Sequence, residues 1–244
     1  MLTTLKLTPA IDASTAQFLS QHYVISASAS WQLDCVDGVF HLQHTEHPAL
    51  NLAIDFGTGK YRHRNHYLGK EPLVNAIKIK GKLPQALLDA TPGLLQDSFM
   101  LAGRGVQITA IERHPLLYVM VNRALARISA QTNEQHHTQT PPHIDYRFGD
   151  ANTLVKDFAT PCIYLDPMYP PRQKKALVKK SMQVLHATVG DDADSDTLLI
   201  NAQKNNARII VKRPSYAPPL ANCPPDLTYQ SKTTRFDIYL PQNS

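Results

Sequence analysis

The sequence predicts an α/β protein with a mostly parallel sheet, an antiparallel edge strand and a small N-terminal α+β domain. From residue 85 onward, short apolar runs alternate with helical patterns, as in sheets built with right-handed crossovers. Several of these runs end in an acid. The preceding segment instead shows a hairpin pattern around Asp37 and Gly38. We therefore predict two domains, residues 1–84 and 85–244.

The N-terminal domain is predicted to contain one helix, a hairpin and one further strand. Residues 31–36 and 39–44 alternate apolar and polar side chains on either side of Asp37 and Gly38, which is a strong hairpin signal. The predicted elements are a helix over 15–23 and strands over 31–36, 39–44 and 51–56.

The C-terminal domain is predicted from alternating strand and helix patterns. Its strongest helix follows Pro115, where apolar side chains recur near helical spacing. Its final strand alternates and is expected to lie antiparallel at the edge. The predicted strands are residues 85–89, 106–111, 144–148, 162–165, 208–214 and 235–240, and the predicted helices are residues 98–103, 115–128, 173–189 and 198–205.

An acid, a proline and an aromatic residue follow the fourth strand of this domain. Pro167 cannot continue a sheet ladder, so Asp166 ends the strand at the edge where open α/β sheets bind ligands. Asp166 and the Pro167 carbonyl can accept both N–H groups of a nucleobase amine, and Tyr169 can stack on the base. These are the predicted catalytic residues. The alternative is that Asp166 only caps the next helix and the prolines form a turn.

The pattern Asp-Pro-x-Tyr resembles the Asp/Asn-Pro-Pro-Tyr/Phe signature of amino-methyltransferases that use S-adenosylmethionine. Such a reaction needs alignment of the amine more than acid–base power, because the sulfonium already carries a positive charge. Asp166 either takes the proton late or only orients the amine, and the residues leave both alternatives open.

Acids also end three neighbouring predicted strands, at Asp89, Glu112 and Asp150. Taken alone, each fits a helix cap or a surface group. Together they favour a nucleoside cofactor, with Glu112 accepting from the ribose hydroxyls and Asp150 from the adenine amino group. Asp97 opens the first helix and is placed near the methionine moiety or acts as a cap. A dinucleotide fits less well, because the first turn lacks Gly-x-Gly-x-x-Gly.

Basic residues are grouped in a way that suits RNA. The net charge is +5, and one group of cations is interleaved with aromatic side chains. The alternative is a solvated basic surface. The predicted RNA-binding residues are Lys60, Arg62, Arg64, Arg172, Lys174, Lys175, Lys179, Lys180, Lys212 and Arg213.

Six segments resemble the RsmJ family, bacterial small-subunit ribosomal RNA guanine-N2 methyltransferases. They are residues 89–99, 112–115, 164–170, 174–180, 211–222 and 235–239. The resemblance implies a Rossmann-like fold that transfers a methyl group from S-adenosylmethionine to the 2-amino group of one guanine. It also implies ribosomal RNA or the assembled small subunit as partner. The cofactor-binding residues by motif and first-turn position are Asp89, Gly93, Gln96, Asp97, Glu112, Arg113, Gly149, Asp150 and Asp166.

The chain departs from that family's usual first loop, Asp-Ala-Thr-Ala-Gly-Leu-Gly-Arg-Asp. Here Pro92, Leu95 and Gln96 replace the second alanine, the second glycine and the arginine. A leucine in place of glycine is expected to narrow the approach of the backbone to the cofactor. The pair Gly149 and Asp150 also differs from the small hydroxyl residues expected there.

Other features bound the function. Three cysteines without a Cys-x-x-Cys pattern predict a reducing compartment, with neither a disulfide framework nor a zinc site. The sequence shows no membrane-spanning run and no export signal, so we expect a cytoplasmic protein without membrane or metal partners. Two alternatives remain: a methyltransferase of the same fold that modifies another nucleobase amine, such as adenine in DNA or RNA, and a non-enzymatic RNA-binding assembly protein. The oligomeric state is left open.

Overall fold

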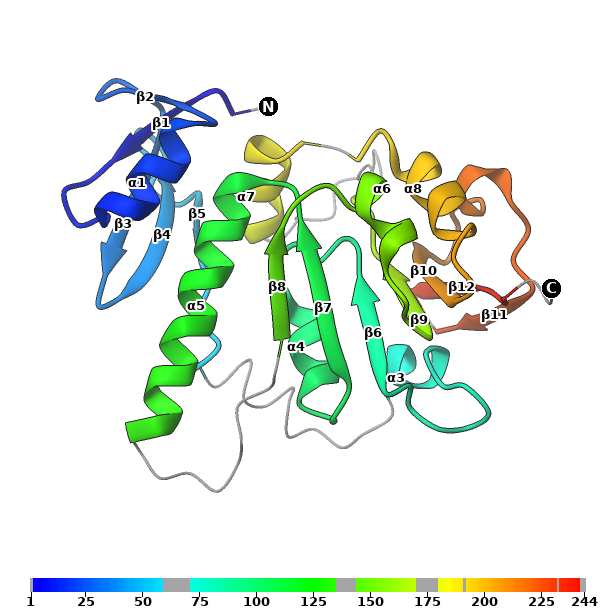
Figure 1. Cartoon of the computed structure of the whole chain (residues 1–244). Helices are drawn as coiled ribbons and strands as arrows, with labels where there is room; N and C mark the ends of the chain where they lie inside the picture. The colour runs from blue at the N-terminus through cyan, green and yellow to red at the C-terminus, as the bar shows by residue number, and fades with distance from the viewer. Residues whose placement is uncertain are drawn as a thin grey trace. The chain divides into compact units, whose positions relative to one another are not determined.

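The computed structural model describes residues 2–58, 71–134, 144–169, 180–190, 192–231 and 233–241 (Figure 1). It contains two compact units. The first unit comprises Met1–Thr58, His114–Pro141 and Pro170–Asp191, and the second comprises Gly59–Arg113, Pro142–Tyr169 and Asp192–Ser244. The first unit therefore adds later segments to the N-terminal residues, and the predicted domain boundary at residue 84 stays a prediction.

The first unit is built on a five-stranded sheet of order β2-β1-β3-β4-β5. Its β3–β4 hairpin is confirmed, and Asp37 and Gly38 both have positive φ (50° and 77°), as the tightest hairpin turns require. Two short strands at the N-terminus were not predicted, and β5 is shorter than expected. The strands are β1 Thr4–Leu7, β2 Val24–Ile25, β3 Trp31–Val36, β4 Val39–His44 and β5 Asn51–Ala53.

Within the described residues, the helices of the first unit are α1 (Ala13–Ser20), α5 (Pro115–Glu134) and α7 (Lys180–Thr188). Helix α5 is joined to the segment that follows β5 by an ion pair of 3.1 Å between Arg127 Nη1 and Asp55 Oδ2. It extends beyond the predicted end at residue 128. Helix α7 begins at Lys180, and residues 173–179 of the predicted helix lie outside the described residues.

The second unit contains a seven-stranded sheet of order β11-β12-β10-β9-β6-β7-β8. Strands β10, β9, β6, β7 and β8 run parallel to one another, whereas β12 runs antiparallel to both β10 and β11. The prediction of β12 at the edge was wrong, because β11 pairs with its outer side. The strands are β6 Ala86–Asp89, β7 Gln107–Glu112, β8 Ile144–Phe148, β9 Cys162–Leu165, β10 Arg208–Pro214, β11 Leu227–Gln230 and β12 Thr234–Tyr239.

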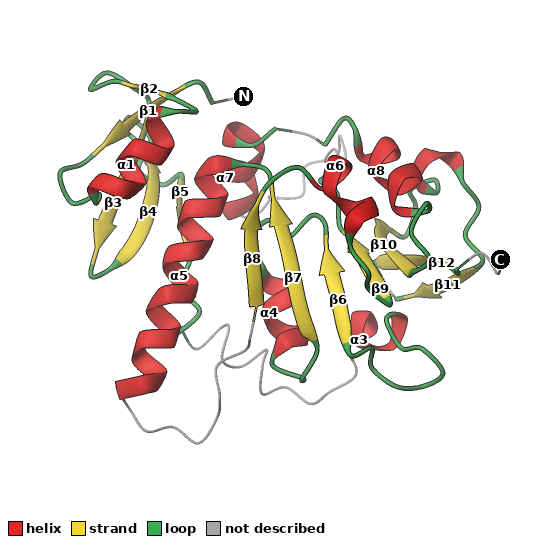
Figure 2. Ribbon diagram, in the orientation of Figure 1, coloured by secondary structure: helices red, strands yellow, loops and turns green. Residues whose placement is uncertain are grey.

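Short helices connect these strands (Figure 2). Helix α4 begins two residues before the predicted residue 98, and α8 begins three before residue 198. Neither α3 nor the short turns were predicted. The elements are α3 Pro72–Ala76, α4 Gln96–Ala102, α6 Ala151–Leu154, α8 Ser195–Ala202 and the 3-10 turns Val155–Asp157 and Leu220–Asn222. None of the helices within the described residues has the length and apolarity to cross a bilayer.

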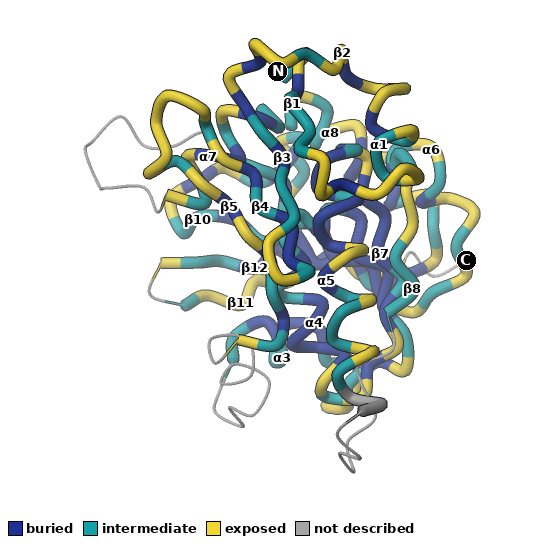
Figure 3. The backbone as a smooth tube through the Cα atoms, turned by 90° about the vertical axis from the view of Figure 1, so that its left-hand side faces the viewer, coloured by how far each residue is buried: buried dark blue, intermediate teal, exposed yellow. Residues whose placement is uncertain are grey.

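Alternation along the parallel strands sorts their side chains onto two faces. Leu88, Ile163 and Ile209 are partners in register and pack with α6 and α8 in one buried apolar cluster. Figure 3 colours the backbone by burial and shows buried residues along β7 and α4. Full burial of such a side chain is worth about 1.5–3 kcal/mol. The neighbouring positions, Asp89 and Tyr164, face the other side of the sheet. This second face carries the polar side chains of the site.

Candidate functional site

The carboxyl ends of β6, β9 and β10 bring an acid, a second acid and a lysine together. Asp89 pairs with Tyr164, and Leu165 pairs with Val211, so Asp166 and Lys212 follow at matching positions. The Lys212 Nζ atom lies 2.7 Å from Asp166 Oδ2. Strands β6, β9 and β10 are far apart in the sequence but adjacent in the sheet, and this adjacency creates the grouping.

A third carboxylate comes from α4. Asp97 Oδ2 accepts hydrogen bonds from Lys212 Nζ at 3.0 Å and from the Tyr164 hydroxyl at 2.7 Å. We call Asp89, Asp97, Asp166 and Lys212 the carboxylate cluster. Because it contains three acids and one cation, its field favours a positively charged ligand group.

Burial sets the titration of these groups. Asp89 is 2% exposed, and its desolvation raises its pKa to about 7, although Ser98 and the Thr91 amide donate to it. Desolvation also raises the pKa of Asp166, and Lys212 opposes that rise. Burial by itself would lower the pKa of Lys212, but the charges of Asp166 and Asp97 raise it above its ordinary value.

The Asp166 carboxylate is nevertheless accessible, with its side chain 36% exposed. The backbone around it is fixed at two points. The Asp166 amide donates to Thr91 Oγ1, and the Met168 amide donates to Asp192 Oδ2 at 2.7 Å. Pro167 between them is buried. The predicted loop is thus a held structure that presents a partly exposed carboxylate.

Tyr169 lies on a cationic and aromatic support. The Arg213 guanidinium carbon is 4.7 Å from the centre of the Tyr169 ring, and Tyr216 meets that ring edge-on with centroids 6.2 Å apart. Arg213 occupies one face of the ring. An aromatic ring supported in this way has the chemistry needed to stack on a nucleobase.

A second cation lies between two carboxylates on the other side of the loop. Arg113 Nη2 is 2.5 Å from Asp192 Oδ1, and Nη1 is 2.6 Å from Asp194 Oδ2. Asn152 also donates to Asp194 at 2.7 Å. We call Arg113, Asp192 and Asp194 the arginine cluster. The guanidinium of Arg113, predicted to contact a cofactor, is engaged with these two acids.

The turn between β6 and α4 contains the predicted cofactor positions Gly93 and Gln96. Gly93 has a φ of +49°, and a Cβ added there would meet nothing within 4 Å, so open space lies beside the turn. Leu95 also has a positive φ, 57°, but its side chain is completely buried. The Leu95 side chain thus lies in the interior, and its effect on the approach of the backbone to the cofactor stays a prediction.

The other predicted cofactor residues follow β7 and β8. Glu112 is 6% exposed, and its carbonyl accepts from the Gly149 amide at 3.0 Å. A Cβ on Gly149 would lie 2.8 Å from Leu154 Cδ1, so packing favours glycine there. Asp150 caps α6, accepting from the Asn152 amide at 2.9 Å. The capping alternative is thus what the Asp150 side chain does, and its contact with a nucleoside stays a prediction.

The structure gives two predicted RNA-binding residues other partners. Lys212 binds Asp97 and Asp166, and the buried Arg213 donates to the Pro218 carbonyl at 3.0 and 3.2 Å. Lys180 is exposed at the start of α7. Seven others lie outside the described residues: Lys60, Arg62, Arg64, Arg172, Lys174, Lys175 and Lys179.

Sequence reasoning missed Thr91, Asp192 and Tyr216. Tyr216 belongs to the distinctive segment 211–222 and could have been noticed there. Thr91 likewise belongs to segment 89–99, which resembles the family. Asp192 accepts from a backbone amide of the loop, and no side-chain pattern predicts such a contact. Within the described residues, no group of three or more His, Cys, Asp or Glu is arranged to hold a metal ion.

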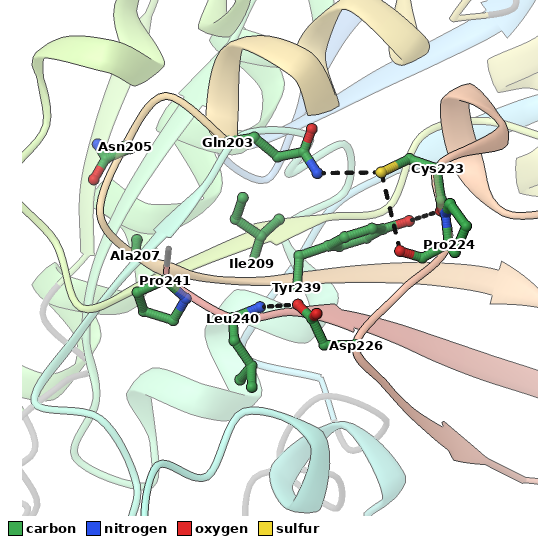
Figure 4. A pocket seen from close by; sticks show the side chains of 10 residues that line it. All are labelled: Gln203, Asn205, Ala207, Ile209, Cys223, Pro224, Asp226, Tyr239, Leu240 and Pro241. Carbon is green, nitrogen blue, oxygen red and sulfur yellow. Dashed lines mark hydrogen bonds between the residues drawn. The ribbon is translucent and has the colours of Figure 1, made fainter. Parts of the chain in front are cut away.

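A cavity also lies at the other end of the strands, beside the first residues of β10 and the last residues of β12 (Figure 4). Gln203 donates to Cys223 Sγ at 3.4 Å, and the Tyr239 hydroxyl donates to the Cys223 carbonyl at 2.9 Å. Its lining contains amides, apolar side chains and one acid, Asp226, which accepts from the Leu240 amide. The cavity is thus separate from the carboxylate cluster.

Comparison with known proteins adds evidence of kinship. The model of a family described as "Putative SAM-dependent methyltransferase" matches residues 18–241. A protein of Haemophilus ducreyi named ribosomal RNA small subunit methyltransferase J is 38% identical over 221 residues, which cover 87% of this chain and 86% of that protein. One of the same name from Psychromonas ingrahamii is 35% identical over 225 residues, covering 90% and 88%.

A solved structure is similar over nearly the whole chain. It is a SAM-dependent methyltransferase from Neisseria gonorrhoeae, with 27% identity and a TM-score of 0.71, and the match covers 99% of this chain and 97% of that one. Together with the mostly parallel sheet, this similarity confirms the predicted Rossmann-like methyltransferase fold.

Proposed function

The chain belongs to the S-adenosylmethionine-dependent methyltransferase family whose curated members are named ribosomal RNA small subunit methyltransferase J, and from this premise we propose that it methylates the exocyclic N2 of a guanine in small-subunit ribosomal RNA. The proposed substrate is the RNA itself or the assembled small subunit. The proposal also implies a cytoplasmic enzyme, because ribosomal subunits are located in the cytoplasm.

The observation that carries the proposal is the partly exposed Asp166 carboxylate on a held loop. An exocyclic amine is a double hydrogen-bond donor and a weak nucleophile, so it must be oriented rather than merely bound. Contacts of the Asp166 and Met168 amides with Thr91 and Asp192 fix the loop on both sides of Pro167. Such a loop can hold an acceptor within the narrow range of directions that transfer requires.

We assign each side chain of the loop a role toward the guanine. Asp166 accepts one N–H of the amine and the Pro167 carbonyl accepts the other. The base leaves its own stack and lies on the face of Tyr169 opposite Arg213. The amines of adenine and cytosine also offer two N–H donors, so these two acceptors fit an exocyclic amine in general, and guanine is proposed from the resemblance to the RsmJ family.

The residues at the carboxyl ends of the strands suit the cofactor. S-adenosylmethionine supplies an electrophilic methyl group on a positively charged sulfur. Asp97 and Asp166 provide negative charge for a cation, and the open space beside Gly93 leaves room for a ligand at the first turn. Glu112 would accept from the ribose hydroxyls, and Asp150 and Gly149 would lie near the adenine. Gln96 would lie at the methionine end.

The RNA contacts are proposed from the sequence pattern. Cations of residues 60–64 and 172–180 would bind phosphates around the target, with an affinity that falls as salt rises. Arg213 would act indirectly, by supporting Tyr169.

The test is methyl transfer from radiolabelled S-adenosylmethionine onto small subunits that lack the modification, followed by mass spectrometry of the nucleosides. We expect N2-methylguanosine, with fully modified subunits as the control. Parallel reactions contain protein-free ribosomal RNA and adenine-rich DNA. Methyladenosine instead of methylguanosine would contradict the guanine assignment. Cofactor binding with no transfer to any nucleic acid would contradict the nucleobase assignment altogether.

A further inference from the structure

Lys212 contacts the Asp166 carboxylate through one of its two oxygens. The 2.7 Å hydrogen bond goes to Oδ2, and among the described residues Oδ1 has no hydrogen-bond partner. The second contact of Nζ, 3.0 Å to Asp97, fixes the ammonium from the direction of α4. The lysine therefore orients the carboxylate and leaves one oxygen available.

The electrostatic surroundings of Asp166 oppose an ionised carboxylate, and Lys212 counteracts them. The titratable and charged groups that face Asp166 are Asp89 on β6, Asp97 on α4, Tyr164 on β9, Asp192 after α7 and Lys212 on β10. The three acids repel a negative charge on Asp166 when they are ionised, and burial disfavours that charge as well. Lys212 is the member of this group whose charge opposes both effects.

We propose that Lys212 is a positioning residue for the transfer reaction: it holds Asp166 ionised and turned so that Oδ1 accepts the target amine. The inference rests on the proposed function, in which Asp166 is the acceptor. It replaces the phosphate-binding role predicted for Lys212 from sequence.

The consequence of removing the ammonium follows from hydrogen-bond polarity. A protonated Asp166 keeps one carbonyl acceptor, but its other oxygen becomes an O–H donor, and the neutral group is a weaker acceptor for the N–H of an amine than the carboxylate. Without Lys212, Asp166 would be protonated up to a higher pH, so the acid side of the rate profile should move upward. Each unit of that shift lowers the rate about tenfold on the acid side.

The experiment compares Lys212→Met, Lys212→Arg and the control Lys204→Met in single-turnover methyl transfer between pH 5 and 9. Lys204 is an exposed lysine after α8 that bonds only Asn201 among the described residues. We expect Lys212→Met to lose at least tenfold at pH 7 and to regain most of that loss by pH 9. Lys212→Arg should restore the profile in part, and Lys204→Met should leave it unchanged.

Two outcomes would overturn the proposal. If the acid side stays in place while RNA binding weakens and its salt dependence falls by about one counterion, Lys212 contacts a phosphate instead. If the rate falls equally at every pH and Lys212→Arg gives no recovery, Lys212 has only a packing role. Lys212→Gln repeats the comparison if the methionine variant does not fold.

A readout without RNA separates this proposal from the proposed function. Protein with ¹³C-labelled aspartate carboxyls is titrated by NMR, and the Asp166 signal is identified by its absence in Asp166→Asn. We expect the midpoint of Asp166 to rise by at least one pH unit in Lys212→Met. An unchanged midpoint would contradict the role of Lys212 even if transfer is observed, whereas absence of wild-type transfer would contradict only the proposed function.

Discussion

Two groups of the second unit share one plan, a cation between two carboxylates, and differ in what the cation achieves. In the arginine cluster, the planar guanidinium gives each acid its own N–H group, at 2.5 and 2.6 Å. In the carboxylate cluster, one ammonium serves Asp97 and Asp166 from a single atom. The forked guanidinium bonds two acids through separate nitrogen atoms, whereas the single ammonium nitrogen of lysine is shared between its two acids.

One acid in each group has a shifted pKa, and the two shifts have opposite directions. The hydrogen bond from Arg113 lowers the pKa of Asp194, whereas desolvation raises the pKa of Asp166. Asp97 is the better shielded acid of the shared lysine, at 13% side-chain exposure. The comparison teaches that ion pairing alone does not indicate a structural role. A carboxylate that keeps a raised pKa beside a cation is a candidate for chemistry, and a well-satisfied one is a candidate for support.

The largest expected effect comes from removing Asp166, the acid proposed to accept the target amine. Asp166→Ala should lower methyl transfer by about 10³-fold, roughly 4 kcal/mol of barrier. Its cofactor affinity, measured by calorimetry, should change by less than about tenfold, because several other acids face the ligand. Asp166→Asn keeps one acceptor oxygen and should retain more activity than Asp166→Ala. Full transfer by Asp166→Ala would remove this residue from the mechanism.

The next effect concerns Asp89, the buried acid of the carboxylate cluster. Its pKa is raised to about 7 in the folded protein, so the folded state binds a proton more tightly than the unfolded chain between about pH 4 and 7. Its contribution to stability is present at low pH and is lost as pH rises through 7. Relative to Asp89→Asn, the wild-type unfolding free energy should fall by about 2–4 kcal/mol across that range.

Urea unfolding at half-unit pH steps measures this difference. Asp194→Asn is the matched comparison from the arginine cluster, because the pKa of Asp194 is lowered. Its contribution should be lost in the other direction, as pH falls through the lowered value. Stability curves for wild type and Asp89→Asn that run parallel would show that Asp89 titrates normally.

The smallest expected effect tests how the arginine cluster supports the loop. Asp192→Ala removes the acceptor of the Met168 amide and should lower the transfer rate about tenfold through misplacement of Asp166. Asp194→Ala removes an equivalent partner of Arg113 without touching the loop. The rate of Asp194→Ala should stay within about twofold of wild type. Equal losses in the two variants would mean that Arg113, rather than the Met168 contact, carries the effect.

Much of the second unit could be predicted because its strands are buried on both faces. Continuous apolar runs such as 162–165 and 209–211 carry that signal, and the acid or proline that follows marks where each strand ends. All four residues of β11 are exposed, so they lack any pattern of burial. The misplacement of β12 at the edge followed from this one undetected strand.

The site was only partly predictable for a related reason. Asp166 could be identified locally, because its neighbours along the chain define the end of β9. The partner of Lys212 depends on β10 lying beside β9 in register, and no property of residues 208–214 alone specifies that neighbour. Leu95 shows the converse: its family position suggests glycine, and the left-handed backbone is kept, but the direction of its side chain is decided by packing.

The sequence separation within the carboxylate cluster has a consequence for biosynthesis. Asp97 and Lys212 are 115 residues apart, and β9 lies between strands made both earlier and later. A nascent chain therefore carries Asp97 and Asp166 without their shared lysine until residue 212 has been synthesised. In an enzyme that modifies ribosomes, the carboxylate cluster would thus be completed only after β10 has emerged from the ribosome that made it.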